Sequence, residues 1–202
     1  MLRGDLLRLR PVQAEDLDAL YSRLNDLEHR GSFFPLGLHS EPTFRRDFEK
    51  DGFWTTDEGM LLMIDTKDEI VGEIEFFPIT HYLVGYELSY LIFGEEHSGK
   101  GYATEAVELL TEYLFARLRM NRLQLNIHPN NEPSRRVAAK AGYVFEGIMR
   151  GGWFHRGEYQ DLEIWSILRN EFDLRKSTLG TSDNRFKSAN DGSPRPSRSD
   201  AL

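Results

Sequence analysis

The residues best suited to chemistry lie in a glycine-rich stretch, GEEHSGKGYATEA, at positions 94–106. Its first eight residues match the phosphate-binding pattern G-x-x-x-x-G-K-[ST] except at the last position, where Gly101 replaces a serine or threonine. A strand-like apolar segment precedes the stretch and a helix-like pattern follows it. Backbone N–H groups at the start of a helix converge on anions, so the stretch predicts an anion-binding loop.

Neighbouring residues argue against a nucleoside triphosphate as that anion. Gly101 has no hydroxyl group to hold Mg²⁺, which P-loop enzymes require. Glu95 and Glu96 bring negative charge into the segment that would surround the phosphates. The following strand, RLQLNIH, contains no aspartate to hold the metal. A P-loop nucleotide hydrolase is therefore the weakest of the hypotheses considered.

Carboxylates on two adjacent strand-like segments could take part in proton transfer. Glu87 lies in YELSYLIF, where alternation places it on one face with Ser89 and Leu91. Glu73 and Glu75 share one face of the preceding segment, IVGEIEFFPI. Each of these carboxylates could equally be a solvated side chain on a strand.

A second polar segment, HPNNEPSRRV, lies between a strand and a helix. Asn131 suits a turn, and Ser134 suits the N-cap of the helix that follows. The chain has no cysteine, and its six histidines form no HxxxH or HExxH pair. We therefore expect no metal site.

The periodicity of apolar residues predicts the elements that position these groups. A helix pattern repeats every three to four residues and a strand pattern alternates. The expected order is β-α-α-β-β-β-α-β-α-β-β, which indicates a single-domain α/β (α+β) fold with a mixed sheet. Strands are expected near 6–11, 60–65, 70–79, 86–93, 122–128 and, as a final pair, 151–168; helices near 17–24, from 40, from 103, and over 134–142.

The C-terminal residues differ in composition from the rest of the chain. We expect a globular domain over 1–174 and a disordered, basic, Ser/Pro-rich tail over 175–202. The tail carries six Lys and Arg against three Asp, so the body holds 19 basic and 30 acidic residues. An acidic body argues against nucleic acid as a partner and suits cationic amines. No apolar run reaches the roughly 20 residues of a membrane span, and no signal peptide is apparent, so we expect a cytoplasmic protein.

Two motifs together resemble the GNAT family of acetyltransferases. Ser98–Ala103 fits the acyl-CoA loop R/Q-x-x-G-x-G/A, except that Ser98 replaces the arginine or glutamine. Asn131–Tyr143 resembles the family segment N-x-x-S-x-r-v-x-x-k-x-G-F and follows the loop by one helix and one strand. Together with YELSYLIF, these features resemble the branch that contains ribosomal-protein and polyamine N-acetyltransferases. The resemblance implies the GNAT fold, a mixed and mostly antiparallel central sheet flanked by helices.

The resemblance also implies acetyl-CoA as co-substrate and no metal. In the family, backbone amides of the loop bind the pyrophosphate, and the strand before it bulges and contacts the pantetheine arm. The matching loop residues are Ser98, Gly99, Lys100, Gly101, Tyr102, Ala103 and Thr104, and the matching strand residues are Leu91, Ile92 and Phe93. Asn131 matches a pantetheine contact, and Arg136 of the same segment is assigned to the cofactor as well.

For catalysis, the resemblance implies direct acetyl transfer to an amine in a ternary complex. Ser134 matches the residue proposed to hydrogen-bond the leaving sulfur. Glu87 corresponds to an acidic residue common in this branch and could act as the base through a water. Glu73 and Glu75 are alternatives for the base. Acceptor contacts are expected from Phe33, Phe34, Glu75 and Asp161.

The sequence leaves the acceptor and the oligomeric state open. A polyamine, an antibiotic, an amino-acid-derived metabolite or a protein N-terminus fits, and the protein is expected to be a monomer or a homodimer. The alternative from another class is a non-catalytic acyl-CoA sensor on the same fold.

Overall fold

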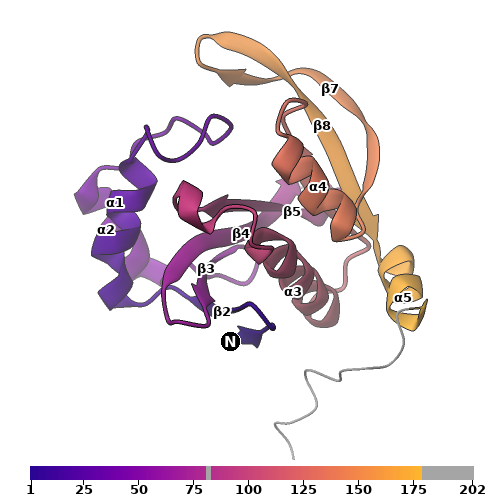
Figure 1. Cartoon of the computed structure of the whole chain (residues 1–202), viewed down its shortest axis with the longest axis horizontal. Coiled ribbons are helices and arrows are strands. Elements are labelled where there is room, and N and C mark those ends of the chain that lie inside the picture. The colour runs from indigo at the N-terminus through magenta and orange to yellow at the C-terminus, as the bar shows by residue number, and fades with distance from the viewer. Residues whose placement is uncertain (81–82, 179–202) are drawn as a thin grey trace, which may run out of the picture.

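The backbone of the protein is organised around one mixed sheet with helices on both faces. A computed structural model describes residues 1–80 and 83–178 (Figure 1). Within these residues the sheet has eight strands in the order β1-β2-β3-β4-β5-β6-β8-β7. The strands are β1 (Leu2–Arg3), β2 (Leu7–Pro11), β3 (Gly59–Asp65), β4 (Ile70–Thr80), β5 (Leu83–Ile92), β6 (Arg122–Ile127), β7 (Val144–His155) and β8 (Glu158–Leu168).

Five α-helices and two short 3₁₀ turns complete the described residues. The helices are α1 (Leu17–Asn25), α2 (Glu41–Asp51), α3 (Tyr102–Arg117), α4 (Glu132–Lys140) and α5 (Arg169–Thr178), and the 3₁₀ turns are Ala14–Asp16 and Glu95–His97. The expected mixed, mostly antiparallel sheet is confirmed, since β5 and β6 form the one parallel pair among the described strands. No helix in the described part of the chain is long and apolar enough to cross a membrane.

Local signals in the sequence explain where several elements begin and end. The Ser40 hydroxyl accepts the Thr43 N–H at the start of α2, and Gly52 ends that helix in the left-handed conformation with φ 68°. The Asp65 carboxylate accepts the N–H groups of Lys67 and Glu69, at 2.8 and 3.0 Å, in the turn between β3 and β4. These contacts fix the register of the strand pair that carries Glu73 and Glu75.

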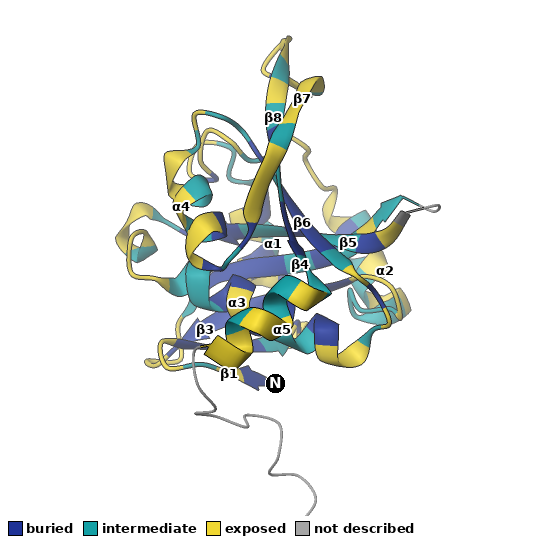
Figure 2. Cartoon of the chain, turned by 90° about the vertical axis from the view of Figure 1, so that its right-hand side faces the viewer, coloured by how far each residue is buried: buried dark blue, intermediate teal, exposed yellow. Residues whose placement is uncertain are grey.

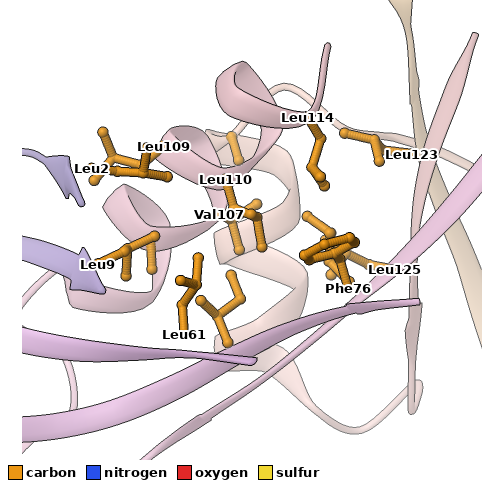
Figure 3. Packing of buried hydrophobic residues seen from close by; sticks show 14 of the residues in the cluster. Leu2, Leu9, Leu61, Phe76, Val107, Leu109, Leu110, Leu114, Leu123 and Leu125 are labelled. Carbon is orange, nitrogen blue, oxygen red and sulfur yellow. The ribbon is translucent and has the colours of Figure 1, made fainter. Parts of the chain in front are cut away.

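Apolar side chains form one core on each face of the sheet. On the α3 face, the buried Val107, Leu110 and Leu114 pack toward Leu61 and Phe76 (Figure 3). On the opposite face, Leu20 of α1 and Phe44 of α2 cover the other side of the strands, in a cluster with Leu62, Leu91 and Phe93. Burying both faces requires the alternation that the sequence shows along β5.

The sheet is weakly joined at its centre. Between β5 and β6 the ladder has two registered pairs among the described residues, Tyr86 with Leu123 and Glu87 with Gln124. Beyond Glu87, β5 continues to Ile92 without a registered partner on that side, although it stays paired with β4 on the other. The two strands therefore diverge, and the end of β5 lines a common groove with the start of α3.

The C-terminal end of the fold differs from the expectation. Helix α5 runs to Thr178, so the expected boundary between 174 and 175 falls inside a helix. Arg175 lies 3.3 Å from Glu108 of α3, and Lys176 pairs with Glu112, which holds α5 against the domain. The short apolar stripe of α5 gave no clear helix signal. The remainder of the expected tail, residues 179–202, lies outside the described residues.

Candidate active site

The glycine loop at the start of α3 has the backbone geometry of an anion site. Gly99 and Gly101 have φ values of 73° and 92°, which only glycine adopts without strain. Gly101 occupies the N-cap position of α3, and no side chain caps that helix. The N–H groups of the first turn therefore remain available to a ligand, and a Cβ at Gly99 would meet nothing within 4 Å, which leaves the loop open.

The loop forms one wall of a groove of about 680 Å³, here called the main groove. The end of β5 and the α4 helix form the other walls, and Lys100, Arg136 and Lys140 place positive charge along it. The groove thus offers backbone N–H groups and cations to a long, anionic ligand. Of the predicted cofactor residues it is lined by Leu91, Ile92, Ser98, Gly99, Lys100, Gly101, Tyr102, Ala103, Thr104, Asn131 and Arg136.

Phe93 differs from this prediction. Its side chain is buried among the residues of the α1–α2 core, and its N–H donates to the Val71 carbonyl oxygen at 2.9 Å. The expected bulge at the end of β5 is also not found, because the register with β4 is continuous from Tyr86 to Ile92. The divergence of β5 and β6 provides the opening instead.

At the start of α4, Asn131 rather than Ser134 is the N-cap. The Asn131 side chain accepts the Ser134 N–H at 3.2 Å. Ser134 therefore lies inside the first turn, and its hydroxyl group is not needed as a cap. Both residues line the main groove, as the sequence predicted.

A second, smaller cavity of about 260 Å³ adjoins the main groove and is here called the side cavity. Glu87 and Ser134 both line it, together with the aromatic residues Phe33, Phe34, Phe77, Tyr90 and Trp153. Five residues line both spaces: Phe33, Phe34, Tyr90, Asn131 and Ser134. A ligand in the groove and a ligand in the side cavity would thus meet beside Ser134.

Among the described residues, Glu87 is the carboxylate that lines the side cavity together with Ser134. Its Oε2 accepts amide N–H groups from Asn126 at 2.8 Å and from Gln124 at 3.3 Å. Burial raises the pKa of Glu87 above its ordinary value, and the two amide donors oppose that rise. The carboxyl group is thus oriented and partly desolvated, as a general base requires.

Glu73 and Glu75 lie elsewhere. Glu73 is 1% exposed, and neither of its carboxyl oxygens has a hydrogen-bond partner within the described residues. Glu75 lines a third cavity, of about 390 Å³, beside Glu58 and the end of α2. Burial and the Glu58 charge raise the pKa of Glu75 to about 7. Neither carboxylate lines the side cavity.

Asp161 has a structural role in the β7–β8 hairpin. Its carboxylate accepts the Gly151 N–H at 2.8 Å, where the register of β7 and β8 shifts. Figure 2 shows this hairpin projecting from the body of the molecule. Asp161 lines neither the main groove nor the side cavity.

The sequence did not single out a ring stack at the side cavity, which Phe33, His128 and Trp153 line. Phe33 stacks on His128 at 4.9 Å between ring centroids, His128 meets Trp153 at 6.4 Å, and Trp153 stacks on His155 at 4.0 Å. The buried His155 donates from Nε2 to the Ser32 carbonyl oxygen at 3.0 Å. This stack joins the α1–α2 connection to β7, and no motif marked it because Phe33 lies far from His128, Trp153 and His155 in the sequence.

Comparison with known proteins agrees with this geometry. The sequence pattern of the acetyltransferase (GNAT) domain matches residues 7–144. The chain belongs to the GNAT acetyltransferase family. The GNAT fold and an N-acetyltransferase class of enzyme, both expected from the motifs, are confirmed.

Two curated GNAT relatives and one solved structure show how far the similarity extends. The chain is 29% identical over 177 residues to the SPbeta prophage-derived uncharacterized N-acetyltransferase YokL of Bacillus subtilis, covering 85% of this chain and 94% of that protein. It is 28% identical over 172 residues to the putative ribosomal N-acetyltransferase YdaF of the same organism, covering 83% and 92%.

The solved structure is that of Vibrio cholerae spermidine N-acetyltransferase in complex with CoA and spermine. It matches with a TM-score of 0.72 at 22% identity, covering 84% of this chain and 99% of that chain. At that identity the match supports the GNAT fold.

Proposed function

We propose that this GNAT protein transfers an acetyl group from acetyl-CoA directly to a primary amine, in a ternary complex of both substrates. The observation that carries the proposal is the junction at Ser134, where the main groove and the side cavity meet. A CoA thioester in the groove would present its carbonyl carbon there. An amine in the side cavity would approach from the side of Glu87.

The side chains support each step of such a transfer. An alkylammonium has a pKa of about 10, so the amine must lose a proton before it attacks. Glu87, held by Asn126 and Gln124, takes that proton directly or through one water. The C–N bond then forms, the C–S bond breaks, and its electron pair goes to the sulfur beside Ser134.

The lining of the side cavity favours a small cationic amine as acceptor. Aromatic faces attract cations, and Phe33, Phe77 and Trp153 line the same cavity as the Glu87 carboxylate. Phe33, His128 and Trp153 of the ring stack line the cavity, whose volume of about 260 Å³ suits a short ligand better than a folded protein. The Vibrio cholerae neighbour bound to spermine supports the same class, and we propose a polyamine as the first acceptor to test.

A turnover screen tests the proposal. Acetyl-CoA would be incubated with spermidine, an aminoglycoside, an amino-acid amide and an N-terminal peptide, and the free thiol measured. We expect thiol release with the small cationic amines and at least 100-fold less with Glu87→Gln. If calorimetry shows CoA binding while no amine is acetylated, the acyl-CoA sensor is the correct interpretation. Binding of Mg-ATP without CoA would restore the nucleotide hydrolase.

A further inference from the structure

Tyr90 occupies the junction of the two spaces and has no function in the scheme above. It lies on β5 between Leu88 and Ile92, and it lines both the main groove and the side cavity. Its side chain packs against the α3 core, so the ring is held from behind. The hydroxyl group faces the α4 side of the sheet, where Ser134 is its polar neighbour.

The Tyr90 hydroxyl is buried and makes no hydrogen bond of normal geometry within the described residues, although Ser134 lies close enough to interact with it. Such groups are uncommon, because a buried hydroxyl left unpaired costs about 1–3 kcal/mol. Burial raises the pKa of Tyr90 to about 12, and Ser134 opposes that rise. The phenol therefore keeps its proton near neutral pH and remains a hydrogen-bond donor.

Other tyrosines show that this situation is specific to Tyr90's position. The buried Tyr143 hydroxyl lies 2.8 Å from the Thr111 hydroxyl, and the Tyr86 hydroxyl donates to Asp57 at 3.4 Å. Tyr143 and Tyr86 thus satisfy their hydroxyl groups within the protein. Tyr90, in contrast, lines both the main groove and the side cavity.

We propose that Tyr90 is a catalytic residue that donates a hydrogen bond to the sulfur of the departing thiolate. The proposal rests on the acetyl-transfer function above. As the C–N bond forms and the C–S bond breaks, negative charge develops on the sulfur at the junction of the two spaces. The phenol keeps its proton, and the thiolate later takes one from solvent, while the amine proton has gone to Glu87.

Physical reasons favour a phenol from β5 at this place. A serine hydroxyl is a weak donor, whereas a phenol is a stronger one and is fixed by its packed ring. Hydrogen bonds to charged groups are roughly twice as strong as those between neutral groups. Tyr90 and Ser134 come from different elements, so they can approach the sulfur from two sides.

The first experiment compares Tyr90→Phe with Tyr143→Phe. We expect Tyr90→Phe to lower kcat about 10- to 100-fold while the Kd for acetyl-CoA changes less than threefold. Tyr143→Phe removes a buried hydroxyl and its hydrogen bond away from the junction, so it should lower Tm and leave kcat within about twofold. A Tyr90→Phe enzyme with kcat within twofold of the parent overturns the proposal.

The second experiment needs no acceptor, so it separates this proposal from the proposed function. Free CoA carries an ionisable alkyl thiol, and a hydrogen-bond donor at the sulfur would favour its thiolate form. Calorimetry of CoA between pH 6 and 9 should show affinity rising with pH relative to acetyl-CoA, which has no thiol. The ratio of the CoA affinity to the acetyl-CoA affinity at each pH cancels the contributions that Glu87, His97 and His128 make to both, since these residues also line the two spaces.

Tyr90→Phe should remove about 10-fold of the extra affinity for CoA at pH 9, and Tyr143→Phe should remove none of it. If Tyr90→Phe and the parent show the same ratio, Tyr90 does not contact the sulfur. If the ratio falls as expected but no amine is acetylated, the sulfur contact stands and the proposed function fails.

Discussion

At the scale of single residues, Glu87 is distinguished from the other strand carboxylates by its partners. Its two amide donors orient the carboxyl group toward the cavity that it shares with Ser134. Because burial raises its pKa, the basic form appears at higher pH than for an exposed glutamate. We expect kcat/KM to rise with pH through this raised pKa, and Glu87→Gln to lose that dependence along with at least 100-fold in rate. Glu75→Gln serves as the control, and a similar loss in that variant would contradict the assignment.

The raised pKa of Glu75 predicts that the stability of the fold depends on pH. Its pKa rises from 4.5 to about 7 on folding, so the folded state holds the proton more tightly than the unfolded chain. The tighter binding of the proton to Glu75 in the folded state contributes its full stability below about pH 4.5, and this contribution is lost as the pH rises through 7. Urea unfolding at pH 8 should show Glu75→Gln more stable than the parent by up to about 3 kcal/mol. The exposed Glu49→Gln should differ little from the parent, and equal effects in both variants would refute the explanation.

At the scale of elements, the start of α4 couples helix stability to the site. Because Asn131 caps the helix, it also sets where Ser134 begins the first turn. Asn131→Ala should lower stability by about 1 kcal/mol and reduce kcat, whereas Asn131→Asp should retain the stability because its carboxylate also accepts the N–H. Thermal unfolding and kinetics measure both effects. Asn130→Ala is the neighbouring control, and stability equal to the parent in Asn131→Ala would refute the capping role.

Sequence periodicity predicted the elements better than it predicted the cavities. Alternation along β5 placed Glu87 and Leu91 on the face opposite Leu88, and the two cores confirm this for Leu88 and Leu91. The same rule grouped Glu75 with the site, but the shared face of a sheet extends over more than one cavity. Which cavity a side chain lines depends on the helices above it and on where the strands diverge, and neither is visible in a strand pattern. Helix α5 escaped prediction because its packing on the domain, rather than its own periodicity, stabilises it.

At the scale of the whole molecule, the acidic body predicts the response to salt. The body carries 30 acidic and 19 basic residues, which attract cations over distances of about 10 Å at 0.1 M salt. For spermidine, kcat/KM should fall several-fold between 50 and 500 mM NaCl, and a singly charged amine should show a smaller decrease. Steady-state kinetics at the two salt concentrations provide the test. Equal decreases for both amines would show that charge steering does not contribute.

The junction between β5 and β6, with its two registered pairs, also affects how rigidly the two parts of the sheet are held together. One part of the sheet runs from β1 to β5, and the other part contains β6, β8 and β7. The backbone ladder between the two parts is short. A molecule bound in the main groove would contact β5 in the first part of the sheet. It would also contact α4, which follows β6 of the second part. Such a ligand would connect the two parts of the sheet. The co-substrate would then stiffen the protein where the central ladder is short, while it positions the acetyl group.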